Sequence, residues 1–159
     1  MACVYTPDGH CRYMLTPQKA AHLQRGYLHM QHHHPELSAR LKAGTFVEEV
    51  YKCMLRYAET TRLPTEADTT IRADDQRALP EALHRALSVL TRCTQERFAS
   101  PLNFNPALRE YWSAHPEDVI FGAHHDAYGC QWTGVSQANA EYEHEELFKA
   151  MRWAVHSAK

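Results

Sequence analysis

Residues 96–103 read Glu-Arg-Phe-Ala-Ser-Pro-Leu-Asn, and residues 136–142 read Ser-Gln-Ala-Asn-Ala-Glu-Tyr. Between these two strings, short apolar and aromatic segments alternate with Pro, Asn and Gly, and helical periodicity is weak. Such a pattern is typical of short buried strands that are joined by turns. The expected strands cover residues 95–99, 119–121 and 131–135. Within this part we also expect one short helix, which begins at Asn105-Pro106 and carries Leu108, Tyr111 and Trp112.

The chain before this stretch has the signals of helices. Thr16 is a good N-cap and Pro17 a good first helical residue, so a helix is expected to begin here. It should end at about His33, because Pro35 disfavours helical geometry in the residue before it. A short second helix is expected over about residues 36–43.

A capping box predicts the next helix. In residues 45–48, Thr-Phe-Val-Glu, the Thr hydroxyl and the Glu carboxylate can each accept a hydrogen bond from a free backbone N–H group. The helix that follows has apolar residues at helical spacing and is expected to end before Pro64. The residues on its apolar face are Phe46, Val50, Met54 and Tyr57. Residues 64–78 are polar and without periodicity, and we interpret them as a loop.

Two more helices are expected, one before and one after the strand-forming stretch. Pro80 begins the first, whose inward-facing residues should be Leu83, Leu87 and Leu90. The last helix runs from about residue 143 to residue 157, with acidic residues in its first turn and basic residues later, as the helix dipole favours. Its apolar stripe consists of Leu147, Met151 and Val155. Helices combined with short strands predict the α/β class, and residues 1–15 are interpreted as an irregular arm.

The composition fits one soluble globular domain. The chain has 159 residues, of which 44% are hydrophobic and 23% charged, enough for one core but not for two large domains. A net charge of -2 gives no strong electrostatic case for nucleic acid binding. No apolar run approaches a membrane span and no secretory signal is visible, so we expect an intracellular protein, cytoplasmic or nuclear. The five scattered cysteines are interpreted as reduced thiols.

The chain has twelve histidines, and three of them could form a metal site. His22, His29 and His33 are seven and four residues apart, a spacing that can bind zinc on one face of a helix. No cysteine or carboxylate stands at a diagnostic spacing, so solvated histidines are favoured and no metal site is predicted. Residues 124–126, His-His-Asp, are interpreted as a polar loop. A set of aromatic residues is interpreted as core rather than as a base-stacking platform: Tyr111, Trp112, Tyr128, Trp132 and Trp153.

Several strings, taken in order, resemble the phosphorylated-CTD-interacting-factor family, the cap-specific adenosine N6-methyltransferases and their protist and viral relatives. The most distinctive string is Phe98-Ala-Ser-Pro-Leu-Asn103. Ala138-Asn139 falls where the family has Ala-Asn-Pro-Pro-Phe. The other matching strings are Met54-Leu-Arg-Tyr57, Ala78-Leu-Pro-Glu-Ala-Leu-His84, Tyr111-Trp-Ser-Ala114 and Phe121-Gly122. The similarity extends over roughly residues 45–158.

The resemblance implies a helical region, residues 1–93, followed by a reduced Rossmann-like methyltransferase core, residues 94–159, the two forming one compact unit. The implied cofactor is S-adenosylmethionine. The resemblance also implies that Asn139 accepts a hydrogen bond from the adenine amine while Tyr142 stacks on the base, which must be presented outside a duplex. The residues that it implies near the cofactor are Ser100, Pro101, Leu102, Asn103, Phe121 and Gly122.

The chain departs from the family pattern at Ala140-Glu141, where the family has two prolines that fix the turn and aim a backbone carbonyl. The later strands of the family's sheet are also expected to be absent. Two hypotheses follow. The first is a methyltransferase-related enzyme that methylates adenine in RNA or DNA, with a cofactor cleft beside residues 98–103. The second is a catalytically inactive homologue that serves as a binding or structural subunit of a larger assembly, with exposed apolar surface and a partner chain that completes the sheet.

Overall fold

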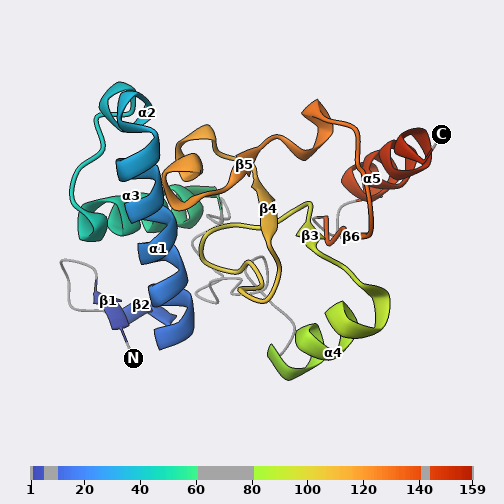
Figure 1. Ribbon diagram of the computed structural model, residues 1–159, viewed down its shortest axis with the longest axis horizontal. Coiled ribbons are helices and arrows are strands. Elements are labelled where there is room, and N and C mark those ends of the chain that lie inside the picture. Colours follow the sequence, from blue (N-terminus) through green and yellow to red (C-terminus); the bar gives the residue numbers. More distant parts are fainter. Residues whose placement is uncertain (1, 6–10, 61–80, 141–143, 159) are drawn as a thin grey trace, which may run out of the picture. The chain divides into compact units, whose positions relative to one another are not determined.

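The computed structural model describes residues 2–5, 11–60, 81–140 and 144–158 (Figure 1). Contacts divide the chain into two compact units. Unit 1 comprises Met1–Gln76 together with Ile120–Gly122, and unit 2 comprises Arg77–Val119 together with Ala123–Lys159. The helix that precedes the sheet therefore belongs to the same unit as the sheet. No helix in the described ranges has the length and apolarity that crossing a membrane requires.

Unit 1 begins with a pair of strands. β1 (Ala2–Tyr5) and β2 (Cys11–Leu15) pair antiparallel, with Ala2 opposite Leu15. The expectation of an irregular arm over residues 1–15 was wrong. The reason is that backbone pairing between two segments this short leaves little periodic signal in the sequence.

α1 (Pro17–His33) begins as the sequence predicted. The Thr16 hydroxyl accepts a hydrogen bond from the backbone N–H of Lys19 at 3.3 Å, which makes Thr16 the N-cap. α2 (Pro35–Arg40) follows after a single residue and ends three residues earlier than expected. It ends there because the backbone at Lys42 turns to a φ of 50°, the left-handed conformation that cannot continue a helix.

α3 (Phe46–Thr60) confirms the capping box. The backbone N–H of Thr45 donates to the Glu48 carboxylate at 2.6 Å, and the backbone N–H of Glu48 donates to the Thr45 hydroxyl at 3.4 Å. The hydrogen bond from the Thr45 backbone holds the pKa of Glu48 below its usual value. The buried residues of this helix include Val50, Cys53, Met54 and Tyr57. The loop expected over residues 64–78 lies outside the described residues.

The segment η2 (Pro116–Phe121) is a 3-10 helix, so the strand expected over residues 119–121 was wrong. The apolar end of η2 is used for packing in unit 1. Phe121 is 1% exposed and its ring lies 6.4 Å from that of Phe46, edge to face. The α1 residue Gly26 passes so close that a Cβ at this position would overlap the carbonyl oxygen of Phe121. An apolar run of this kind looks the same whether it is a buried strand or a buried turn of helix.

α4 (Glu81–Thr91) and α5 (His144–Ser157) belong to unit 2. The expected inward residues of α4 were wrong, because Leu83, Leu87 and Leu90 are exposed and His84 is the buried side chain. Helical spacing shows which residues share a face, but not which face meets the rest of the protein. In α5 the expected stripe does share one face, and that face is exposed as well.

Four short strands form the sheet of unit 2. They are β3 (Gln95–Glu96), β4 (Glu110–Ser113), β5 (His124–His125) and β6 (Ser136–Gln137). All three pairings are parallel, and the order across the sheet is β5-β4-β3-β6. In Figure 1 this sheet lies in the yellow and orange part of the chain. Helices and a small parallel sheet confirm the α/β class.

The strands are shorter and differently placed than the sequence indicated. Only the first two residues of the segment 95–99 form a strand, and the strand expected over 131–135 was wrong, since β6 begins at Ser136. The helix expected from Asn105 was also wrong, because a turn closed by the Leu108 N–H on the Asn105 carbonyl leads directly into β4. Two-residue strands are defined by their partners across the sheet, so a local pattern cannot locate them.

Candidate functional site

The order of the sheet reverses between β3 and β6. From β3 the chain runs outward through β4 to β5, and then returns to place β6 on the other side of β3 (Figure 1). Glu96 pairs with Gln137, so the residues that follow β3 and those that follow β6 lie at the same edge. In open α/β sheets, ligands bind beyond the carboxyl ends of the strands at such a reversal. The segments 97–103 and 138–140 therefore define the candidate site.

The turn after β3 is closed on itself. The Asn103 side-chain oxygen accepts hydrogen bonds from the backbone N–H of Ser100 at 2.6 Å and from its hydroxyl at 3.1 Å. The Ser100 hydroxyl in turn accepts from the backbone N–H groups of Leu102 and Asn103, both at 3.2 Å. Ser100, Pro101 and Leu102 are buried. These polar groups of the turn hold its own shape through local hydrogen bonds.

Arg97, the first residue after β3, fills the space beside the turn. It is 1% exposed, and its guanidinium carbon lies 4.0 Å from the ring centre of Trp112 and 5.5 Å from that of Trp132. Its Nε donates to the Ser136 hydroxyl at 3.0 Å, and Nη2 donates to the side-chain oxygen of Gln95. Burial lowers the pKa of Arg97, although the group stays protonated. One cation thus ties β3 to β6 and stacks on two indole rings.

The last residue of β3, Glu96, is a buried carboxylate. Glu96 is 5% exposed and accepts hydrogen bonds from the backbone N–H of Asn105 at 2.8 Å and from the Gln137 side chain at 3.2 Å. These bonds connect β3 to β6 and to the turn that precedes β4. A buried charge is tolerated when hydrogen bonds replace its water shell. Glu96 therefore organises the sheet around the candidate site.

An aromatic cluster connects the segment after β3 to α5. It consists of Phe98, Tyr128, Trp132 and Trp153. The Phe98 ring is 5.2 Å from that of Tyr128 and 5.7 Å from that of Trp132. The Trp153 indole donates to the Cys130 carbonyl at 3.0 Å, which fastens α5 to the chain before β6. The Lys149 ammonium lies 4.1 Å from the Tyr128 ring centre. All four rings are half-buried, whereas Tyr111 and Trp112 are core, as predicted.

The remaining residues of the predicted site are distributed differently. Asn139 follows β6 and is exposed, while its neighbour Ala140 is buried. Phe121 and Gly122 belong to unit 1 through their packing near Gly26, whereas residues 98–103 belong to unit 2. Tyr142 lies outside the described residues. The structure thus brings the 97–103 and 138–140 segments to one edge, and it uses Phe121 as core.

The histidines at the end of α1 gather in one place. The ring centres of His29 and His33 are 4.4 Å apart, and those of His32 and His33 are 4.6 Å apart. Desolvation, and then the nearby imidazoles of His29, His32 and His34, lower the pKa of His33. Burial, and then the positive charge of Arg25, lower the pKa of His22. Within the described ranges, no group of three or more His, Cys, Asp or Glu side chains has the arrangement of a metal site.

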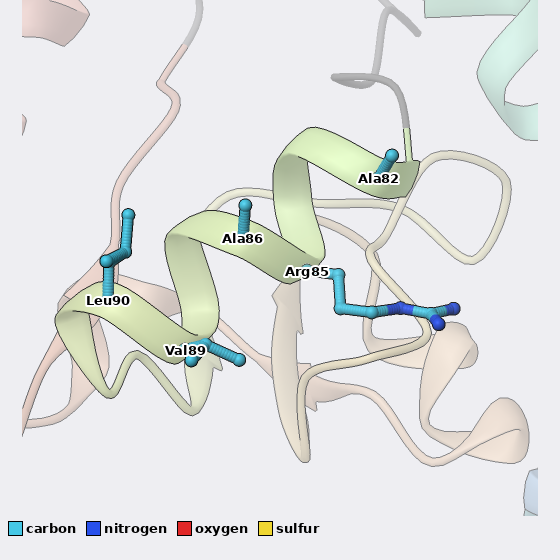
Figure 2. Close-up of a pocket in the computed structure, with 5 residues that line it drawn as sticks. All are labelled: Ala82, Arg85, Ala86, Val89 and Leu90. Atoms are coloured by element: carbon cyan, nitrogen blue, oxygen red, sulfur yellow. The ribbon is translucent and has the colours of Figure 1, made fainter.

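A hollow of about 840 Å³ runs along α4. Figure 2 shows Ala82, Ala86 and Leu90 along one side of the helix, with Arg85 and Val89 extending from the other. None of residues 98–103 lines it. The hollow is therefore separate from the candidate site at the ends of β3 and β6.

Comparison with known families decides the relationship of the chain. The family model described as the phosphorylated CTD interacting factor 1 WW domain matches residues 27–157. The chain belongs to this family. No curated protein and no solved structure matches it significantly. The matched range contains the C-terminal part of α1, all of α2 to α5 and the whole parallel sheet, so both strings at the candidate site lie within the family region.

Two central residues of this family member were missed by sequence reasoning. Glu96 and Arg97 are adjacent charged residues at the end of a short strand, and charged side chains are normally exposed to solvent. Both are buried. The signal that could have identified them is their position directly before the Phe-Ala-Ser-Pro-Leu-Asn string, the most distinctive string of the chain.

Proposed function

We propose that this chain is a methyltransferase-related protein that acts as a binding subunit and does not transfer methyl groups by itself. The observation that carries the proposal is the packing of Arg97 against Trp112 and Trp132 beside β3. A small-molecule site needs a concave space lined by groups that can turn toward the ligand. Here a guanidinium and two indole rings occupy the space at the reversal of the sheet.

In this proposal S-adenosylmethionine is not bound at the turn after β3, because the polar groups of that turn already hydrogen-bond one another. Both polar groups of Ser100 are bonded to Asn103, and the residues between them are buried. A cofactor would have to open this turn before any of these groups could bind it. The Ala140-Glu141 sequence adds to the argument, because it lacks the prolines that would hold Asn139 toward a base.

The partner we propose is a phosphorylated protein segment. The family description names an interaction with phosphorylated CTD. WW domains, the class that the description names, bind extended proline-containing segments on aromatic grooves. The aromatic cluster offers half-buried rings, and Lys149 beside Tyr128 is an exposed cation on the same surface. We propose that prolines contact the rings and that the phosphate contacts Lys149.

Fluorescence anisotropy tests this proposal with a serine-phosphorylated, proline-containing peptide and its unphosphorylated twin. We expect the phosphorylated peptide to bind more tightly and Lys149→Glu to abolish the difference. Lys52→Glu is the matched control, because Lys52 is about equally exposed and also pairs with a glutamate three residues earlier. Equal binding of the two peptides, or an equal loss in both variants, would contradict the assignment.

A second candidate function is S-adenosylmethionine-dependent adenine N6-methylation of RNA or DNA. The observation that favours it is the strand order, since a reversal beside the first strand of a parallel sheet is the arrangement of the first four strands of doubly wound folds. In this candidate, Asn139 would face the adenine and a partner chain would extend the sheet beyond β6.

Calorimetry with S-adenosylmethionine separates the two functions. Micromolar binding that is lost in Asn103→Ala would overturn the binding-subunit proposal and favour the enzyme. No binding up to millimolar cofactor is the result we expect. Circular dichroism of the variant checks that the loss of one buried turn has not unfolded unit 2.

A further inference from the structure

α5 carries a stripe of exposed apolar side chains that its own unit does not cover. The stripe consists of Leu147, Phe148, Met151 and Val155, which are 36%, 64%, 65% and 63% exposed. The opposite face holds the helix in place, with Ala150 and Ser157 buried and the Trp153 indole bonded to the chain before β6. A continuous apolar face of this kind marks an interaction surface.

Charged residues border the stripe in a definite order. At 100° per residue, Glu145, Arg152 and His156 fall along one edge of it, with the acid near the start of the helix and the bases toward its end. The helix dipole has the opposite polarity, positive at the start and negative at the end. Lys149 lies farther round the helix, where it faces Glu146 at 3.6 Å and the Tyr128 ring.

We propose that the stripe docks against the same stripe of a second copy of this chain, with the two α5 helices antiparallel. A two-fold axis perpendicular to the helices brings the same edge of each helix together, and the two edges then run in opposite directions. Glu145 of each copy then lies within a turn of Arg152 and His156 of the other copy. A parallel two-fold pairing would instead place this charged edge against the opposite edge of the other copy, which carries Ala150 and Ala154, so the charges would have no partner. The charge order and the dipoles both select the antiparallel arrangement.

Sedimentation velocity on residues 1–159 between about 5 and 500 µM tests the proposal, a range in which weak dimers dissociate. We expect a concentration-dependent dimer. Phe148→Glu should raise the dissociation constant at least about thirty-fold, because it puts a charge in the centre of the stripe. Val89→Glu on α4 is the matched control, since Val89 is an apolar helix residue that is 74% exposed. It should leave the dissociation constant unchanged.

A charge exchange tests the direction of the helices. Glu145→Arg alone and Arg152→Glu alone should each weaken the dimer, because each brings like charges together at both symmetric contacts. An equimolar mixture of the two variants restores both contacts and should dimerise as well as the parent protein. Circular dichroism confirms that the variants keep their helices.

Three outcomes would overturn the proposal. A monomer throughout the concentration range would mean that a second copy of the chain does not cover the stripe. A dimer that Phe148→Glu does not weaken would lie elsewhere on the surface. A mixture of the charge variants that associates no better than either one alone would exclude the antiparallel pairing.

Discussion

Replacing Arg97 by alanine removes the side chain that ties β3 to β6. The structure gives three contributions to the cost. Deleting a large buried side chain costs about 2–5 kcal/mol through lost contacts and the cavity left behind. The acceptors on Gln95 and Ser136 each lose a charged donor, which adds about 1 kcal/mol or more. Relief of the desolvated charge offsets part of this.

We therefore expect the Arg97→Ala variant to lose about 3 kcal/mol of unfolding free energy. Arg97→Lys keeps the charge but not the planar fork that stacks on Trp112, and should lose about 2 kcal/mol. Urea titration followed by tryptophan fluorescence measures both values. The probe is local, because Trp112 and Trp132 are the rings that contact the guanidinium.

Arg109→Ala is the control, because the Arg109 side chain is exposed and a surface change of this kind costs less than about 0.5 kcal/mol. The reasoning is refuted if the unfolding free energies of Arg97→Ala and the parent protein differ by less than about 0.5 kcal/mol, which is the usual size of the effect of a surface substitution. Such a result would mean that the two indoles pack equally well without the cation.

Three further predictions concern unit 1. Thr45→Ala should lower the free energy of unfolding in urea titration by about 1 kcal/mol, since it removes one half of the capping box. The pKa of Glu48 is lowered in the folded protein. The stability from this box is therefore present above pH 4.5 and is lost as the pH falls below it. Gly26→Ala should cost about 1–3 kcal/mol, because the added methyl group overlaps the Phe121 carbonyl. His22 should titrate below its usual value of 6.5 in an NMR pH series. Its unfolded form then binds the proton more tightly, so stability should fall as the pH drops below 6.5.

Each of these predictions has its own contradicting result. An unchanged urea midpoint for Thr45→Ala at pH 7 would remove the capping box from the stability of α3. Gln24→Ala, an exposed position of α1, is the control for Gly26→Ala, and equal effects would contradict a specific clash. A His22 resonance that titrates at or above 6.5 would contradict its partial burial.

Helix beginnings were the part of the fold that the sequence predicted best. Thr16 caps α1 and Thr45 caps α3 in the predicted way, because a cap is made by residues three or four positions apart. The sequence did not predict which faces of α4 and α5 are buried. Their apolar residues do align as predicted, but both faces are exposed. Which face is covered depends on neighbours that the helix sequence does not contain.

The sheet could not be located from local patterns. Glu96 pairs with Gln137, more than forty residues away, and each strand of that pair is two residues long. Parallel strands of this length have no alternation to detect. For the same reason the burial of Arg97 was not foreseen. Its position between two indole rings depends on Trp112 and Trp132, which reach it only through the folded connections.

The sequence by itself determined the family, the α/β class and the two strings that meet at one edge of the sheet, because these depend on residue order and on short-range capping chemistry. Only the tertiary structure decided what stands at that edge. Arg97 stacks there on Trp112 and Trp132 because the strand order brings their segments together, whereas the Ser100–Asn103 turn beside it is held by its own local hydrogen bonds.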